Sequence, residues 1–183
     1  IFEMDRRARW QDGTPVTARD AALAINLARD PAVDAQSALL LRLVAEATAT
    51  DDSHLVVRFT EPYDEQLYDA VYHVYPLPAH LVDTIPRGAL AKSAYAAAPV
   101  GNGPYRWTRR VPKQQLELAA YDQFFLGKPG PRRVLYLTVG DAEARMNLLL
   151  SGDADVLAAP GTGSSVARVT ADKPVGYLIA LER

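Results

Sequence analysis

The stretch that most constrains the fold is residues 10–20, WQDGTPVTARD, which follows a strand-like run and leads into a helical pattern. Asp12-Gly13 favours a tight turn, because glycine takes a positive φ without steric cost. Pro15 fixes its own φ and favours an extended residue before it. Thr17 is a good helix N-cap, and Asp20 can return the hydrogen bond in a variant of the capping box. The stretch therefore predicts a strand, a turn and a capped helix.

Strand and helix patterns alternate along the rest of the chain, which predicts an α/β fold with a mixed sheet. Residues 35–43 are ambiguous between helix and strand, and residues 87–98 are Ala-rich, weakly helical and expected at the surface. The run 133–139 is apolar on both faces, which is typical of a central strand. Expected strands are residues 1–9, 43–48, 55–60, 105–111, 114–121, 133–139, 153–158 and 175–181, and expected helices are 17–29, 64–71, 79–85 and 142–151.

Length and charge exclude several classes of protein. The chain has 183 residues, 20 basic and 22 acidic side chains and a formal net charge of −2, so no basic face for nucleic acid is expected. No apolar run approaches the length of about 18 residues that a transmembrane helix needs. Cysteine is absent, which excludes disulfides and cysteine catalysis. The chain lacks an initiator Met and begins inside an expected strand, so we interpret it as a piece of a longer protein.

The sequence offers no catalytic or metal-binding constellation, so we expect no enzyme, no metal and no cofactor. His54, His73 and His80 are not at metal-ligand spacing. Residues 163–165, Gly-Ser-Ser, lack the spacing and the preceding strand of a nucleophile elbow. The acidic pair in residues 153–155 is typical of a solvated turn after a helix.

A second informative stretch is residues 99–105, PVGNGPY. Gly101 and Gly103 let the backbone turn or approach another group closely. The stretch is not a dinucleotide-binding fingerprint, because Pro104 and a strand follow where a helix would hold the pyrophosphate. We favour a structural role for the two glycines over direct contact with a ligand.

Five motifs in order resemble those of the family 5 extracellular solute-binding proteins, the receptors of oligopeptide, dipeptide and nickel ABC importers. The first is W-x-D-G-x-P-x-T-A-x-D at residues 10–20. The second is P-x-G-T-G-P-Y at 99–105, where Asn102 replaces the usual Thr. The others are the aromatic Gly-Lys-Pro loop at 121–129, the D-x-x-x-R helix start at 141–145, and the S-G-D-x-D-V step at 151–156.

The resemblance implies a periplasmic-binding-protein type II-like lobe, here incomplete, within a bilobed receptor that closes on its ligand. It implies that residues 1–183 are one lobe, with 10–98 as an outer subdomain and 99–183 as a hinge-proximal subdomain. It also implies a peptide or small-molecule ligand, importer membrane subunits as partners, and a periplasmic or extracellular location with a lipid anchor as an option. Receptors for peptides, nickel chelates, oligosaccharides and opines share these motifs.

The candidate ligand-binding residues are Tyr72, His73, Tyr75, Asn102 and Gly103. Aromatic faces with a few polar tips suit a ligand of peptide size, although packing in the core or a surface position is an equal alternative for the aromatic segment. The resemblance implies that this segment lies near the cleft and that the groups holding peptide termini come largely from the other lobe. We expect the two tryptophans to be packing anchors.

Two other functions stay open. The same fold serves as the sensory domain of bacterial transcription regulators, and a helix-turn-helix upstream of Ile1 would indicate that function, whereas a signal peptide would indicate a receptor. A small hydrolase is a weaker alternative, because it needs a nucleophile beside a base and the sequence shows no such pair.

Overall fold

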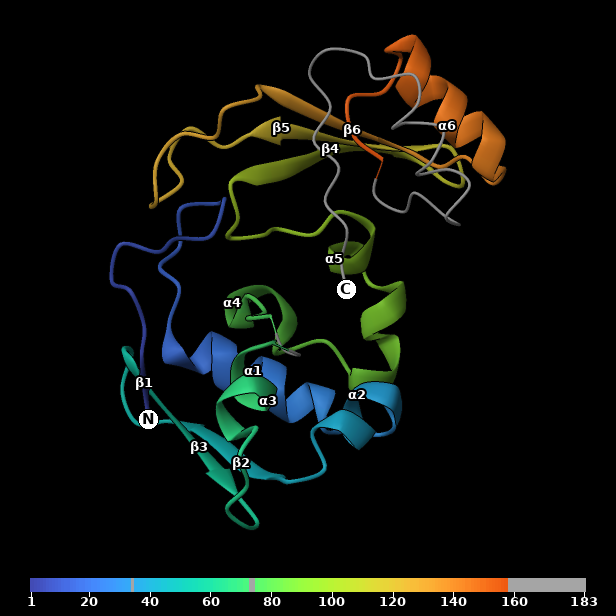
Figure 1. Cartoon of the computed structure of the whole chain (residues 1–183). Coiled ribbons are helices and arrows are strands. Elements are labelled where there is room, and N and C mark those ends of the chain that lie inside the picture. The colour runs from blue at the N-terminus through green and yellow to red at the C-terminus, as the bar shows by residue number, and fades with distance from the viewer. Residues whose placement is uncertain (34, 73–74, 158–183) are drawn as a thin grey trace. The chain divides into compact units, whose positions relative to one another are not determined.

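The computed structural model describes residues 1–33, 35–72 and 75–157, which form helices and short antiparallel strands (Figure 1). The chain divides into two compact units. The first comprises residues 1–109 and 117–134, and the second comprises residues 110–116 and 135–183. The expected loop at 160–165 and the expected strand at 175–181 lie outside the described residues.

A three-stranded antiparallel sheet in the first unit has the order β1-β3-β2. Its strands are β1 (Phe2–Glu3), β2 (Val44–Ala49) and β3 (His54–Phe59). The expected hairpin of residues 43–60 is confirmed, but its simple alternation is wrong. A register shift between Val44 and Glu46 puts Val44 and Ala47 on the buried side, because the irregularity moves the inward face by one residue.

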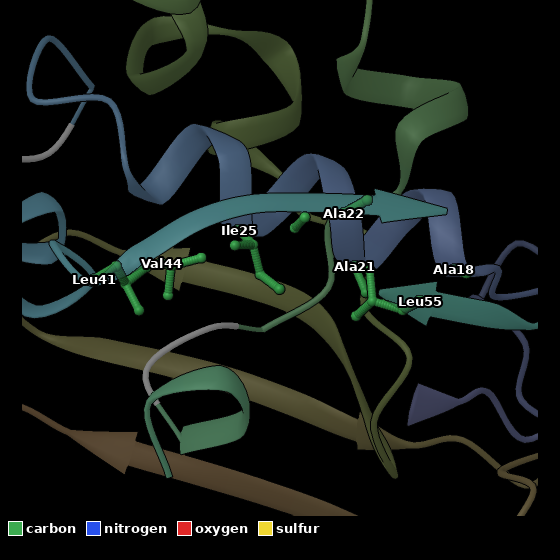
Figure 2. Close-up of a cluster of buried hydrophobic side chains, with 8 residues drawn as sticks. Ala18, Ala21, Ala22, Ile25, Leu41, Val44 and Leu55 are labelled. Atoms are coloured by element: carbon green, nitrogen blue, oxygen red, sulfur yellow. The ribbon is translucent and has the colours of Figure 1, made fainter. Parts of the chain in front are cut away.

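The core of the first unit lies between α1 (Ala18–Ala28) and this sheet (Figure 2). Small side chains on α1 let the helix approach the strands closely, and Ile25 supplies the bulk. The buried members of the cluster are Ala18, Ala21, Ala22, Ile25, Leu41, Val44, Ala47 and Leu55. Burial of this apolar surface favours folding by roughly 25 cal/mol per Å² removed from water.

Short helices connect the remaining parts of the first unit. They are α2 (Ala35–Leu40), α3 (Gln66–Tyr72), α4 (Ala79–Val82), the 3₁₀ helix η1 (Arg87–Lys92) and α5 (Ala94–Ala97). In the run 35–43, which was ambiguous between helix and strand, the first six residues therefore form a helix. The structure also confirms the weakly helical, largely exposed character of residues 87–98.

A second sheet has the order β4-β5-β6. Its strands are β4 (Tyr105–Val111), β5 (Gln115–Ala120) and β6 (Arg133–Leu137). The turn between β4 and β5 contains Lys113 with φ of 59°. The expectation of a central strand at 133–139 is wrong within the described residues, because β6 lies at the edge of this sheet and most of its side chains are exposed.

The helix α6 (Ala142–Ser151) begins and ends as its sequence predicts. The Asp141 carboxylate accepts a hydrogen bond of 2.7 Å from the Ala144 N–H, and Gly152 ends the helix with φ of 80°. The strand expected at 153–158 is not formed in residues 153–157. Instead the Ala154 N–H returns to the carbonyl of Leu148 at 3.0 Å, which extends the helix cap.

The strand expected over residues 1–9 is also shorter than predicted. The Asp5 carboxylate accepts from the Arg7 N–H at 2.9 Å, and the Asp5 carbonyl accepts from the Ala8 N–H at 2.9 Å. This local turn ends the strand after Glu3, because a short acidic side chain competes for backbone donors. Arg9 then forms an isolated bridge with Pro15.

The turn and the helix cap within residues 10–20 are confirmed. The Gly13 N–H donates to the Trp10 carbonyl at 2.8 Å, and Gly13 has φ of 93°. The Thr17 N–H donates to the Asp20 carboxylate at 2.7 Å, which is the returning half of the capping box. His80 of α4 lies 2.7 Å from the Asp12 carboxylate, measured from Nε2 to Oδ2.

Asp20 is the buried polar group that joins these segments. It is 3% exposed. Besides the Thr17 N–H, its carboxylate accepts from the Thr17 hydroxyl at 3.2 Å, the Trp10 indole N–H at 3.2 Å and the Ala79 N–H at 2.8 Å. The carboxylate therefore ties the turn, the start of α1 and the start of α4 together.

We predict that Asp20→Asn destabilises α1 by about 1–3 kcal/mol, because the amide nitrogen leaves at least one buried N–H without an acceptor. The measurement is hydrogen exchange of α1 amides in the full-length protein, which reports local opening. Asp83→Asn is the matched control, since Asp83 forms an exposed ion pair with Arg19 on α1 and should cost less than about 1 kcal/mol. Equal effects of the two substitutions would contradict this account.

A second prediction concerns the stability of the fold at acidic pH. Partial burial raises the pKa of Asp12, but hydrogen bonds from His80 and Thr14 outweigh it, so the pKa lies below the ordinary 3.8. A carboxyl with a lowered folded-state pKa stabilises the fold above its unfolded pKa and loses that effect as the pH falls. The difference in melting temperature between wild type and Asp12→Asn should therefore shrink between about pH 5 and pH 3. A difference that stays constant over this range would refute the assignment.

Candidate ligand-binding site

A cavity of about 310 Å³ lies in the first unit beside the start of the 10–20 stretch. Six segments of the chain contribute to its lining: the turn, the residues before α4, the helix α5, the 99–102 run, the strand β4 and the strand β5. The lining residues are Trp10, Gln11, Tyr75, Pro76, Leu77, Tyr95, Pro99, Val100, Gly101, Asn102, Tyr105, Trp107 and Leu118.

The wall of this cavity is aromatic and uncharged. None of its described lining residues is acidic or basic, and five are Trp or Tyr. Burial raises the pKa of the Tyr95 phenol above its ordinary value, and the Tyr95 hydroxyl lies 3.5 Å from the Val100 carbonyl. An apolar wall with a few polar groups is the usual character of a small-molecule or peptide side-chain site.

Gln11 holds the 101–105 segment in place. Its Nε2 donates to the carbonyls of Gly103 at 3.1 Å and Tyr105 at 2.8 Å, and its Oε1 accepts from the Gly101 N–H at 3.3 Å. The Gln11 backbone N–H also donates to the Gly101 carbonyl at 2.9 Å. One side chain therefore fixes one wall of the cavity.

The structure does not support the expectation that Gly101 and Gly103 are needed for a turn or a close approach of the backbone. Neither Gly101 nor Gly103 has a positive φ. A Cβ at Gly101 would meet the Gln11 side chain at 3.6 Å, which is ordinary contact, and one at Gly103 would meet nothing within 4 Å. The backbone conformation therefore needs no glycine at either position, and the hydrogen bonds to Gln11 set the path of this run.

The structure brings Tyr75 and Asn102, two of the predicted site residues, into the lining of one cavity. Tyr75 is 82% exposed. The carboxamide of Asn102 makes no hydrogen bond to another described residue, which leaves a donor and an acceptor available. Gly103 lies beside the cavity, with its carbonyl bonded to Gln11.

The other two predicted site residues are not placed at this cavity. Tyr72 ends α3 and stacks on Tyr68, with ring centroids 4.5 Å apart, and does not line the cavity. His73 lies outside the described residues.

Both tryptophans line the cavity, although they were expected to be packing anchors. Trp10 is 1% exposed and bonded to Asp20, so the expected anchoring role holds for it. Trp107 on β4 is only half-buried and presents part of its side chain to the cavity. Burial separates the two tryptophans, and the sequence carries no signal for that difference.

A second cavity, of about 420 Å³, has a different chemistry. Its lining includes Arg106, Arg132 and Asp122, and Gln11 lines both cavities. Arg132 donates to the Asp122 carboxylate at 2.9 Å, and Lys128 lies 3.7 Å from the same group. The charges of the second cavity are thus partly neutralised by one another.

The described histidines are engaged with carboxylates. His54 lies 2.8 Å from Asp51, and His80 is paired with Asp12. Within residues 1–33, 35–72 and 75–157, no group of three or more His, Cys, Asp or Glu is arranged to hold a metal ion. Among the same residues, no helix is both long and apolar enough to cross a membrane.

The family model "Bacterial extracellular solute-binding proteins, family 5 Middle" matches residues 1–179. A Brucella ovis protein named "Putative ABC transporter peptide-binding protein" is 31% identical over 147 residues, which are 80% of this chain and 28% of that protein. The oligopeptide-binding protein AppA of Bacillus subtilis is 30% identical over 87 residues, which are 47% of this chain and 16% of AppA.

Solved structures share the fold. The structure of Bacillus subtilis AppA with a nonapeptide has a TM-score of 0.76 at 20% identity, covering 82% of this chain and 30% of that chain. MoaA of A. tumefaciens R10 with mannopinic acid has a TM-score of 0.78 at 24% identity, and the match covers 93% of this chain and 34% of MoaA. NikZ of Campylobacter jejuni with Ni(L-His) has a TM-score of 0.72 at 22% identity, and the match covers 82% of this chain and 30% of NikZ.

These matches agree with the five ordered motifs and with the mixed helix and sheet architecture, which is that of part of a periplasmic-binding-protein type II structure. The chain spans about 28% of the length of the Brucella ovis relative. The chain belongs to the family 5 bacterial extracellular solute-binding proteins.

Proposed function

We propose that the protein containing this chain is the solute-binding component of an ABC importer, and that it captures oligopeptides or dipeptides by closure of two lobes. The observation that carries the proposal is the family match over residues 1–179. Contacts made only in the closed state would shift the population toward closure when ligand binds.

We favour peptides over nickel chelates and opines as the ligand, because the relatives named for peptides have the higher sequence identity to this chain. The relatives that are 31% and 30% identical are named as peptide-binding and oligopeptide-binding proteins. The nickel-chelate and opine complexes are 22% and 24% identical, so their likeness concerns the fold. An uncharged aromatic cavity also suits peptide side chains.

Within the receptor we propose that Tyr72, His73, Tyr75, Asn102 and Gly103 lie at or near the ligand cleft. The lining positions of Tyr75 and Asn102 support this for two of the five. We further propose residues 10–98 as the outer subdomain and 99–183 as the hinge-proximal subdomain of one lobe.

The proposed location is periplasmic or extracellular, in keeping with the family's name, and the proposed partners are the importer's membrane subunits. A lipid anchor would be a further contact with the membrane. The alternative, a sensory domain of a transcription regulator, would require a helix-turn-helix in the full-length protein. The extracellular family and the transporter names of the relatives favour the receptor.

We predict that full-length protein binds members of a di- to pentapeptide pool in isothermal titration and becomes more compact on binding. Closure should lower the radius of gyration in small-angle X-ray scattering, because the two lobes approach each other. The control is the same protein with free amino acids. Absence of heat with every peptide would refute the peptide assignment, and binding without compaction would refute closure.

A further inference from the structure

We propose that the 310 Å³ cavity is a selectivity pocket for one uncharged aromatic or large apolar side chain of the peptide. This inference rests on the proposed function, since it names the class of peptide that the receptor prefers. For brevity we refer to the cavity lined by Tyr75, Asn102 and Trp107 as the aromatic pocket.

The size of the aromatic pocket sets what it can hold. Ligand sites in proteins commonly have volumes of about 300–1,000 Å³. At about 310 Å³ the pocket is at the small end of that range, so it has room for one large side chain but not for an oligopeptide. The rest of the ligand would have to lie outside it.

The chemistry of the wall selects against charge. No described lining residue is ionised, so a carboxylate or ammonium group entering the pocket would lose water without gaining an ion pair. The half-buried Trp107 and the neighbouring Tyr105 instead offer ring faces and edges, against which an aromatic ring packs favourably.

The polar group that the wall does offer fits a peptide backbone. The Asn102 carboxamide makes no hydrogen bond to another described residue. A carboxamide presents one acceptor and two donors, which match the N–H and C=O of a peptide group. Asn102 would therefore bind the main chain next to the inserted side chain, and the ring would fill the aromatic pocket.

Two parts of the wall are held before any ligand arrives. Trp10 is fixed by its hydrogen bond to the buried Asp20, and the 101–105 run is fixed by three hydrogen bonds of the Gln11 side chain. A preformed pocket loses little conformational entropy on binding, which strengthens discrimination between side chains. The charged second cavity, with Arg106 and Arg132, has no such aromatic wall.

The test uses the full-length protein and three sets of alanine tripeptides that carry Phe, Asp or Lys at each position in turn, with trialanine as reference. We expect the best Phe peptide to bind at least about tenfold more tightly than trialanine, and the Asp and Lys peptides to gain nothing. The variant Trp107→Ala should lose most of the difference in affinity between the Phe peptide and trialanine, whereas Trp107→Phe should retain that difference.

Tyr136→Ala is the matched control, because Tyr136 is an exposed aromatic residue on β6 that lines neither cavity. It should leave the Phe preference unchanged. Circular dichroism shows whether each variant is folded. If Trp107→Ala unfolds, Tyr105→Ala replaces it, because Tyr105 is the neighbouring ring of the same lining, and this variant should weaken the Phe preference.

The outcomes separate the two proposals. Binding of all peptides with equal affinity, or a Phe preference that survives Trp107→Ala, overturns the aromatic pocket and leaves the peptide receptor in place. Failure of every peptide to bind overturns the proposed function itself.

Discussion

The buried carboxylate of Asp20 is the interaction on which the first unit depends. A carboxylate removed from water is costly unless hydrogen bonds replace its hydration. Here those bonds come from the Trp10 indole, the Thr17 backbone and hydroxyl, and the Ala79 backbone. Because the donors come from three segments, all three must be in place together for the charge to be satisfied. Asp20, the third residue of α1 and the returning partner in its capping box, is thus also a tertiary link.

The neighbouring side chains of the same stretch extend this link to the candidate site. Asp12 pairs with His80 of α4, and Gln11 bonds to three positions of the 101–105 run. Eleven consecutive residues therefore connect α1, α4 and the entry to β4. These polar contacts hold Trp10 and the 101–105 run, which form part of the lining of the aromatic pocket.

Local chemistry made much of the fold predictable from the sequence. The turn at Gly13, the capping box of Thr17 and Asp20, and both ends of α6 follow from residues within a few positions of one another. The strand predictions were wrong where a local hydrogen bond or an irregularity in strand pairing changed the backbone. Asp5 ended the first strand early, and the shift between Val44 and Glu46 changed which side chains of β2 face the core.

The candidate site was harder to predict, because its residues meet only through tertiary contacts. Tyr75 and Asn102 stand out in the sequence by their aromatic and Gly-rich surroundings. Gln11 has no such signal, since an isolated glutamine beside a turn is ordinary, and its role depends on backbone carbonyls some ninety positions away. Trp107 likewise differs from Trp10 only in burial, which a sequence does not state.

The most direct test of this account is a crystal structure of the full-length protein with a bound peptide that contains phenylalanine. We predict the phenyl ring inside the aromatic pocket, packed against Trp107, with the Asn102 carboxamide bonded to the adjacent peptide group. A bound peptide whose ring lies elsewhere, with the pocket occupied only by water, would contradict the account.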